Sequence, residues 1–269
     1  MSGKRGLVMG VANDKSIAWG IAAATARHGA ELAFTYQNEA LERRVRPLAA
    51  SAGSDRVFPC DVAEPGALEA LFANVAKTWD RLDFVVHAIA YSDKTELKGR
   101  YLDTSLENFR RTMEISCYSF TETARLAAPL MTGGGSLITL SYSGANRVMP
   151  NYNVMGVAKA ALEASVRYLA ADLGPGAVRV NALSAGPMRT LAGSAIADAR
   201  AVYRWNAEHA PLRRNVSLEE VGNAALYLLS DLSSGVTGEV HHVDSGYNVI
   251  GVSGPSPNPS PGPSSGPPR

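Results

Sequence analysis

Two residues near the middle of the sequence have the types and the spacing for redox chemistry. Tyr152 precedes Lys159 by seven positions, in a stretch whose apolar residues recur at helical spacing after Pro150. Positions seven apart return to nearly the same helix face, roughly 10 Å apart along the axis. A tyrosine hydroxyl can stabilise negative charge that develops on an oxygen, and an ammonium group can bind ribose hydroxyls. The pair therefore predicts a nicotinamide-dependent reductase site.

The same spacing argues against the reduction of carbonyls. Short-chain dehydrogenases that act on carbonyls place the tyrosine four residues before the lysine, where this chain has Met155. They usually carry a catalytic serine where Tyr142 stands, seventeen residues before Lys159. Methionine has no proton to give, so the pattern favours a rearranged site with two tyrosines. A carbonyl reductase or dehydrogenase of that superfamily and a non-catalytic dinucleotide sensor remain the alternatives.

A glycine-containing loop follows the first predicted strand in VMGVANDKSIAWGIA, with the form G-x5-S-x3-G. Gly10 closes the strand, and Gly20 is expected where a side chain would hold the following helix off the sheet. Ser16 falls at the start of that helix, where the helix dipole and unpaired N–H groups favour a pyrophosphate. A tight turn without a ligand would also favour both glycines. The position at the start of a parallel α/β chain favours a dinucleotide site.

The ends of the next two predicted strands bear on the choice of cofactor. Gln37 stands roughly where an acid would bind the adenosine ribose of NAD, and no base stands immediately beside it. Arg43 and Arg44 come later, on the expected helix, so NADH is favoured over NADPH. Asp61 and Val62 stand where an adenine could bind, although a plain turn aspartate also fits there.

Composition excludes several classes of protein. The chain has 269 residues and a formal net charge of +1, which suits one large α/β domain and gives no basic footprint for nucleic acid. Cys60 and Cys117 are too few for a disulfide scaffold or a zinc cluster, so we expect buried free thiols and no metal. No apolar stretch is long enough to span a membrane, and no secretory signal is evident. We therefore expect a cytoplasmic protein.

Strand-like apolar runs alternate with helical segments along the chain. The predicted strands are RGLVMG, ELAFTY, RVFPCDV, LDFVVHAIA, GSLITLSY, VRVNALSAG and GEVHHVDSG, and the predicted helices are residues 18–28, 65–78, 106–130, 152–173 and 218–229. Such a pattern predicts one doubly wound, Rossmann-like α/β domain over residues 1–251, with about seven parallel strands and helices on both faces. Ligands of such folds bind beyond the carboxyl ends of the strands.

The last residues, 252–269, have a different composition. They are rich in proline, serine and glycine and contain almost nothing apolar to bury, which predicts a disordered tail. A passive extension is one interpretation, and a proline-rich docking peptide is the other.

At these motifs the sequence resembles the bacterial enoyl-acyl-carrier-protein reductases, which are divergent short-chain dehydrogenases. The motifs are the glycine loop, FTYQN, CDVAE, Tyr-x6-Lys, RVNALSAGPMRT and GEVHHVDSGYN, and they cover nearly the whole chain to about Gly251. Tyr-x6-Lys is far more specific than the glycine loop. The resemblance implies NADH-dependent reduction of a trans-2-enoyl thioester on acyl carrier protein, in type II fatty-acid biosynthesis, by a homotetramer.

The resemblance also implies roles for particular residues. Tyr152 would stabilise an enolate on the thioester oxygen, Lys159 would bind the nicotinamide ribose, and Tyr142 would position substrate or supply a proton. The remaining positions that match the family are Gly10, Ser16, Ile17, Gln37, Asp61, Val62, Ile89, Met188 and Thr190 at the cofactor and Ser92 at the substrate.

Two segments near this site depart from the family pattern. The family often has serine and glycine where Ala88 and Ala90 stand, and alanine where Ser92 stands. The segment SAIADARAVYRW suits a mobile lid over an acyl chain. Some relatives carry more basic residues there for the acidic carrier protein, whereas this chain keeps Arg200 and Arg204.

Overall fold

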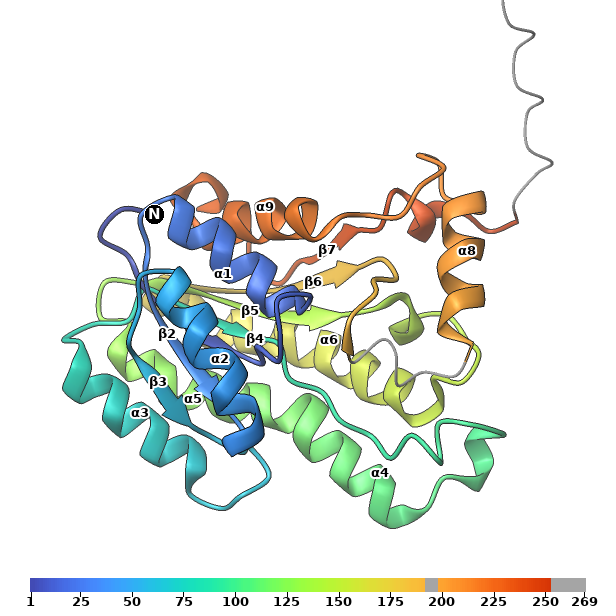
Figure 1. The fold of residues 1–269 in the computed structure, drawn as a ribbon, viewed down its shortest axis with the longest axis horizontal. Helices are drawn as coiled ribbons and strands as arrows, with labels where there is room; N and C mark the ends of the chain where they lie inside the picture. The colour runs from blue at the N-terminus through green and yellow to red at the C-terminus, as the bar shows by residue number, and fades with distance from the viewer. Residues whose placement is uncertain (192–197, 253–269) are drawn as a thin grey trace, which may run out of the picture.

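Seven parallel strands form a single sheet in the computed structural model, which describes residues 1–191 and 198–252. The strand order is β3-β2-β1-β4-β5-β6-β7, and each neighbouring pair is parallel (Figure 1). The strands are β1 (Arg5–Met9), β2 (Glu31–Tyr36), β3 (Val57–Pro59), β4 (Phe84–His87), β5 (Gly135–Ser141), β6 (Val178–Ala185) and β7 (Val240–Val243). Each of the predicted strands is present, and the doubly wound fold is confirmed.

The α-helices that connect these strands also agree with the apolar periodicity of the sequence. In the described ranges they are α1 (Ile17–Arg27), α2 (Glu39–Ser51), α3 (Ala67–Thr78), α4 (Leu106–Met113), α5 (Ser119–Ala127), α6 (Asn153–Leu173), α8 (Ala199–His209) and α9 (Leu218–Leu229). Of these helices, the sequence analysis did not predict α2 and α8. Both helices are mostly polar and bury few residues, α2 only Val45 and Ala49 and α8 only Asn206.

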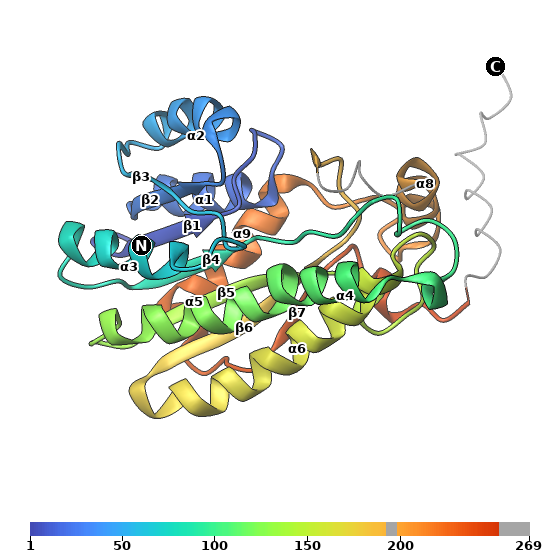
Figure 2. The ribbon, with the colours of Figure 1, turned by 90° about the horizontal axis from the view of Figure 1, so that it is seen from below.

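Helices cover both faces of the sheet, as Figure 2 shows. On one face, α3, α5 and α6 pack their apolar sides on β1, β4, β5 and β6, with Phe120 and Leu162 among the fully buried side chains. On the other face, α1, α2 and α9 pack around Phe34 and Phe84. Burial on both faces explains why the strands are continuously apolar rather than alternating.

One predicted helix is interrupted where it passes the carboxyl ends of the strands. Residues 106–130 form α4, a π-helical turn (Glu114–Tyr118) and α5 in succession. The extra residue of a π turn changes which side chains face inward, and such turns often lie at functional sites. Here the turn buries Ser116, which bonds to Tyr91 in the loop after β4, and Cys117, which contacts Ser165 on α6.

The sheet has a topological switch point between β1 and β4. From β1 the chain runs to β2 and β3 on one side, and then crosses to β4 and onward on the other. Gly10 follows β1 with φ 98°, and a Cβ there would lie 2.1 Å from the carbonyl oxygen of Ala88. The connections after these two strands therefore approach each other closely at the switch point, the place where ligands of such folds bind. Helix α8 stands at the end of the molecule to which β5 and β6 point (Figure 1).

The expected reason for Gly20 is wrong. A Cβ on Gly20 would lie 2.5 Å from Cγ of Leu218, on α9 rather than on the sheet. A Cβ on Gly222 would in turn lie 2.6 Å from the Gly20 carbonyl oxygen. The two glycines therefore allow α1 and α9 to pack with their backbones in contact.

Within 1–191 and 198–252, no helix is long and apolar enough to cross a membrane, and no group of His, Cys, Asp and Glu could hold a metal ion. Cys60 and Cys117 are buried free thiols, as predicted, and burial raises the pKa of Cys60 to about 12. Of the predicted tail, residues 253–269 lie outside the described residues.

The contact between α1 and α9 can be tested with a single methyl group. Gly222→Ala should lower the free energy of unfolding by roughly 1–3 kcal/mol, because backbone of α1 blocks the added Cβ. Gly235→Ala is the matched control, since nothing lies within 4 Å of its Cβ. Urea unfolding of both variants checks the difference. Equal stability of the two variants would contradict the close packing.

Candidate active site

The two tyrosines singled out by the sequence meet at the carboxyl end of β5. Tyr142 directly follows β5, and Tyr152 directly precedes α6. Their ring centroids are 5.2 Å apart with an interplanar angle of 69°, an edge-to-face contact. Burial raises the pKa of Tyr142 to about 12 and raises the pKa of Tyr152 further. Both phenols therefore remain protonated at neutral pH, as hydrogen-bond donors must.

Tyr152 is not within the helix, in contrast to the prediction of a helix over 152–173. Helix α6 begins at Asn153, whose φ of 37° interrupts the helical backbone between the tyrosine and the lysine. Asn151 on the other side has φ 57°. The seven-residue helical repeat therefore does not by itself set the direction of Tyr152. A turn with two left-handed residues does.

Two glycines that the sequence analysis missed make room for the Tyr152 ring. A Cβ on Gly144 would lie 2.3 Å from Cδ1 of Tyr152, and a Cβ on Gly156 would lie 2.7 Å from the Gly144 carbonyl oxygen. The connection after β5 thus lies directly on the first turn of α6. Glycine two positions after Tyr142, in SYSGA, was the available signal.

Lys159 is buried beside β5, on the helix that Tyr152 precedes. Its Nζ donates a hydrogen bond of 2.7 Å to the carbonyl oxygen of Leu140, and its exposed fraction is 6%. Burial lowers the pKa of Lys159 to about 8, while Cys117 and Glu163 act in the opposite direction. Glu163, one turn further along α6, accepts a hydrogen bond of 2.5 Å from Ser141 Oγ. The site therefore contains a cation close to its titration point at physiological pH.

A buried histidine at the end of β4 completes the surroundings of the lysine. His87 has no exposed surface, and its Nε2 lies 2.8 Å from Ser119 Oγ and its Nδ1 3.3 Å from Thr139 Oγ1. Burial, and secondly the charge of Lys159, lower the pKa of His87 to about 3. The imidazole is therefore neutral and links β4, β5 and the start of α5 without adding charge.

The glycine loop has the form expected for a dinucleotide. Ser16 is the N-cap of α1, and its Oγ accepts hydrogen bonds of 3.0 Å from the N–H groups of Ala12 and Asn13. Ile17 is the first residue of α1. The loop is thus closed on itself at a helix N-terminus, beside Gly10 and the switch point. This arrangement fits an anionic pyrophosphate.

The residues predicted to bind the adenosine end lie together. Gln37 Nε2 donates a hydrogen bond of 2.8 Å to Asp61 Oδ2, joining the ends of β2 and β3. Val62 is partly buried against the core. Arg43 lies on α2 near Glu39, and Arg44 is also on α2, as expected. An amide and a carboxylate suit ribose hydroxyls, and the carboxylate would repel a 2′-phosphate.

Hydrogen bonds from α4 and from the π turn hold the loop after β4 in place. Ile89 is partly buried against the core, on the same face as α3, α5 and α6. Ser92 Oγ accepts a hydrogen bond of 2.9 Å from Thr112 Oγ1 and one of 3.2 Å from Asn108 Nδ2. Ser116 Oγ binds both the N–H and the carbonyl oxygen of Tyr91. The hydroxyl of Ser92 therefore bonds to α4, and the predicted contact of the Ser92 backbone with substrate stays a prediction.

Part of the segment after β6 lies outside the described residues. Met188 lines a small hollow with Lys15, Tyr203 and Val216, between the glycine loop and α8. The Thr190 N–H donates to the carbonyl oxygen of Met188. Of the predicted lid over residues 194–205, residues 194–197 lie outside the described residues, and residues 199–205 form the first part of α8.

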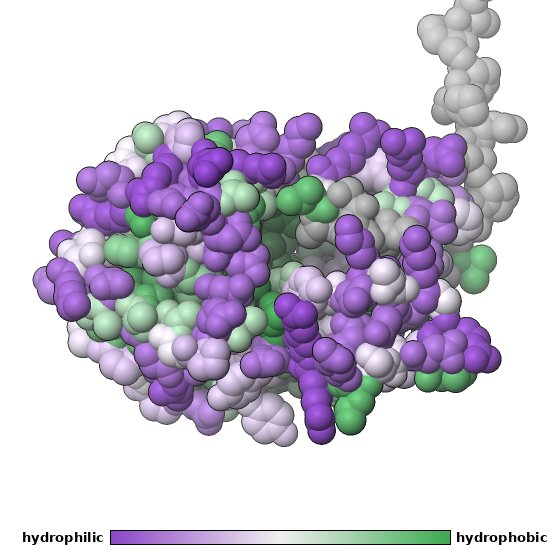
Figure 3. Space-filling model, turned by 60° about the horizontal axis from the view of Figure 1, so that its bottom comes forward, coloured by the Kyte–Doolittle hydropathy of each residue, from purple (hydrophilic) through white to green (hydrophobic). Residues whose placement is uncertain are grey.

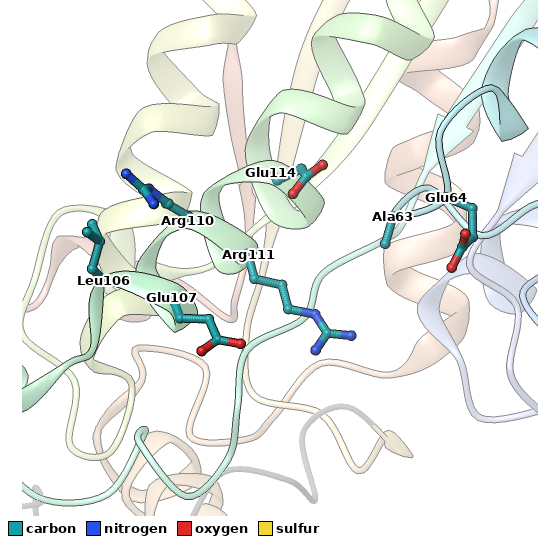
Figure 4. Close-up of a pocket in the computed structure, with 7 residues that line it drawn as sticks. All are labelled: Ala63, Glu64, Leu106, Glu107, Arg110, Arg111 and Glu114. Carbon is teal, nitrogen blue, oxygen red and sulfur yellow. The ribbon is translucent and has the colours of Figure 1, made fainter.

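A larger hollow of about 700 Å³ lies beside the adenosine end. Figure 4 shows its lining residues, which come from the loop after β3 and from α4 and the π turn. They are Ala63, Glu64, Leu106, Glu107, Arg110, Arg111 and Glu114. Neither tyrosine nor Lys159 lines it, so this mixed-charge hollow is not the place of the chemistry. The face in Figure 3 is hollowed near its centre, with hydrophobic surface between hydrophilic borders.

Comparison with known proteins agrees with this geometry. The family model described as "Enoyl-(Acyl carrier protein) reductase" matches residues 10–248. The curated enoyl-[acyl-carrier-protein] reductase [NADH] 2 of Rhizobium meliloti is 65% identical over 93% of this chain and 93% of its own length. The corresponding Rickettsia bellii protein is 57% identical over 93% of this chain and 96% of its own.

A solved structure extends the agreement to three dimensions. The enoyl-acyl-carrier-protein reductase of Anaplasma phagocytophilum, crystallised in complex with NAD, superposes with a TM-score of 0.91. It is 59% identical, and the match covers 94% of this chain and 97% of that one. The family predicted from Tyr-x6-Lys is thereby confirmed. This chain belongs to the enoyl-acyl-carrier-protein reductase family.

Proposed function

We propose that the protein reduces a trans-2-enoyl thioester on acyl carrier protein to the saturated thioester, with NADH, in the elongation cycle of type II fatty-acid biosynthesis. The observation that carries the proposal is the contact of Tyr142 with Tyr152 beside the buried Lys159. Met155 occupies the position of a carbonyl-reducing tyrosine, which disfavours the alternative of a carbonyl reductase. The matched relatives named for this activity support the same conclusion.

The residues present account for the parts of this reaction. NADH, when bound, supplies the hydride that adds to the β-carbon of the enoyl group. Tyr152 donates a hydrogen bond to the thioester oxygen as negative charge develops there, in a buried site where such a donor is most effective. Its raised pKa keeps the proton on the phenol. Tyr142 contacts the Tyr152 ring edge to face, and it positions the substrate or supplies the proton that the α-carbon of the enolate takes up to give the saturated thioester.

Different residues bind the adenosine, the pyrophosphate and the nicotinamide parts of the cofactor. Gly10 and Ser16 receive the pyrophosphate with Ile17, and Gln37, Asp61 and Val62 receive the adenosine. Lys159 binds the ribose of the nicotinamide and adds positive charge to the active site. Ile89, Met188 and Thr190 complete the nicotinamide end. The Gln37–Asp61 hydrogen bond supports NADH over NADPH, because a 2′-phosphate would face a carboxylate.

The proposal includes two macromolecular partners. An acidic carrier protein suits α8, which presents Arg200 and Arg204 one turn apart and exposed. Other copies of this chain suit the outer side of α6 and the π turn, where Tyr118, Val157 and Tyr168 are exposed. The cytoplasmic location stays a prediction.

The first prediction of this proposal is that substitutions of Tyr152 and Lys159 impair turnover and NADH binding differently. With crotonyl-CoA and NADH, Tyr152→Phe should lose on the order of a hundredfold in kcat and keep its affinity for NADH, because it loses only a donor aimed at developing charge. Lys159→Ala should lose NADH affinity as well as turnover. Stopped-flow turnover and equilibrium titration with NADH measure both effects.

The same assay separates the alternatives. The unmodified protein should reduce crotonyl-CoA and leave a 3-oxoacyl thioester unchanged, and it should prefer NADH to NADPH. Reduction of the 3-oxoacyl thioester instead would support a carbonyl reductase. Binding of NADH without turnover of either substrate would support a sensor. Full activity of Tyr152→Phe would overturn the mechanism even if the reaction is correct.

A second prediction follows from the pKa of Lys159. The ammonium loses its proton as the pH rises through about 8, so kcat/KM for NADH should fall through that range. Glu163→Gln removes a negative charge that favours the ammonium, and the fall should therefore begin at lower pH. Glu31→Gln, at the exposed start of β2, is the control and should leave the profile unchanged. An identical profile for all three proteins would exclude Lys159 as the titrating group.

A third prediction concerns assembly. Static light scattering should give a mass of about four chains of 28.4 kDa each. Tyr168→Arg should lower that mass, because it places a charge on an exposed aromatic position of α6. A monomer for the unmodified chain would refute the tetramer and leave the proposed chemistry untouched.

A further inference from the structure

The turn that carries Tyr152 has an uncommon backbone. Asn151 and Asn153, on either side of it, have φ angles of 57° and 37°, in the left-handed region that L-residues other than asparagine and aspartate rarely adopt. Tyr152 itself has φ −109° and ψ −30°. Two left-handed residues around one right-handed residue fix the direction of the tyrosine side chain, and such a conformation persists only where the surroundings hold it.

Hydrogen bonds of the Asn153 side chain hold this backbone conformation in place. Its Nδ2 faces three backbone carbonyl oxygens of the loop after β4, those of Glu96 at 3.4 Å, Leu97 at 3.1 Å and Gly99 at 3.3 Å. Three acceptors converge on one amide nitrogen with two hydrogens. Leu97, in the same loop, is buried against Tyr152 and Met155. The asparagine and the tyrosine next to it therefore contact the same short loop.

That loop is in turn fastened to α4. The Glu96 carboxylate accepts hydrogen bonds of 2.9 Å from both the N–H and the Oγ of Ser105, the N-cap of α4. The Asp93 N–H donates to Asn108 Oδ1 at 3.0 Å. The carbonyls that Asn153 contacts thus belong to a segment with fixed ends, so they can define the position of the turn.

We infer that Asn153 is a positioning residue for the reaction, which fixes Tyr152 at the height of the substrate by clamping the start of α6 to the carbonyls of residues 96–99. It does not contact the reacting atoms. Its role rests on the proposed function of Tyr152 as the donor to the thioester oxygen. Lys159 lies two turns away and is held by Leu140, so the clamp acts on the tyrosine and not on the cofactor lysine.

Three substitutions distinguish the backbone requirement at position 153 from the hydrogen bonds of the Asn153 side chain. Asn153→Gly permits the positive φ and removes the amide, and Asn153→Asp permits the positive φ but directs oxygen atoms at three carbonyls. Both should lose roughly tenfold to a hundredfold in kcat with crotonyl-CoA, the scale of a displacement of about 1 Å, with unchanged affinity for NADH. Asn146→Gly, exposed in the same connection, is the matched control and should keep full kcat.

A double-mutant cycle tests whether the effect passes through the tyrosine. In the Tyr152→Phe background, Asn153→Gly should cause little further loss of kcat, because the donor that it positions is already gone. An equal loss in both backgrounds, unaltered kcat in Asn153→Gly, or loss of NADH affinity together with kcat would overturn the inference. If Asn153→Gly does not fold, Asn153→Asp carries the same test. Full activity of Tyr152→Phe alone would show that the proposed function of Tyr152 had failed first.

Discussion

Lys159 keeps an ammonium group almost entirely out of water, and much of the surrounding structure serves to hold it there. Its Nζ bonds to the Leu140 carbonyl oxygen, Glu163 supplies the nearby negative charge, and His87 stays neutral beside it. A buried cation without such partners would lose its proton or pull its helix away from the sheet. The hydrogen bond of Lys159 on α6 to Leu140 on β5 fixes the helix against the strand. It thereby brings Tyr142, which follows β5, close to Tyr152, which precedes α6.

The two tyrosines are a consequence of that packing. Tyr142 and Tyr152 are at the adjoining ends of the two elements that the lysine joins, and they meet edge to face. The room for this contact comes from Gly144, which lets the connection lie on α6. The placing of a neutral phenol near a buried cation therefore follows from one helix–strand contact, and the strand order sets the switch point where we propose that the dinucleotide binds.

The sequence predicted the fold and the family because their signals are local. Strand and helix periodicity recovered each strand of the sheet, and the Tyr152–Lys159 spacing with Met155 between them distinguished the family from carbonyl reductases. Gln37 and Asp61 were each assigned to the adenosine end of the cofactor, and their side chains meet because the two residues follow neighbouring parallel strands. Cofactor and catalytic roles of these residues stay predictions.

Other features depend on neighbours that are distant in the sequence. The packing of Gly20 on α9, the hydroxyl of Ser92 bonded to α4 and the π turn in residues 106–130 each require a partner that no local pattern reveals. The helical repeat was an incomplete argument for pairing Tyr152 with the lysine, because the flanking asparagines have positive φ angles and the tyrosine lies just outside the helix.

A crystal structure with NAD⁺ and a non-reacting enoyl thioester analogue would test this account most directly. The account predicts the Tyr152 hydroxyl about 3 Å from the thioester oxygen, the Lys159 Nζ on the nicotinamide ribose, and the tyrosine still in the turn before α6. A thioester oxygen bound by another donor, with Tyr152 out of reach, would contradict it.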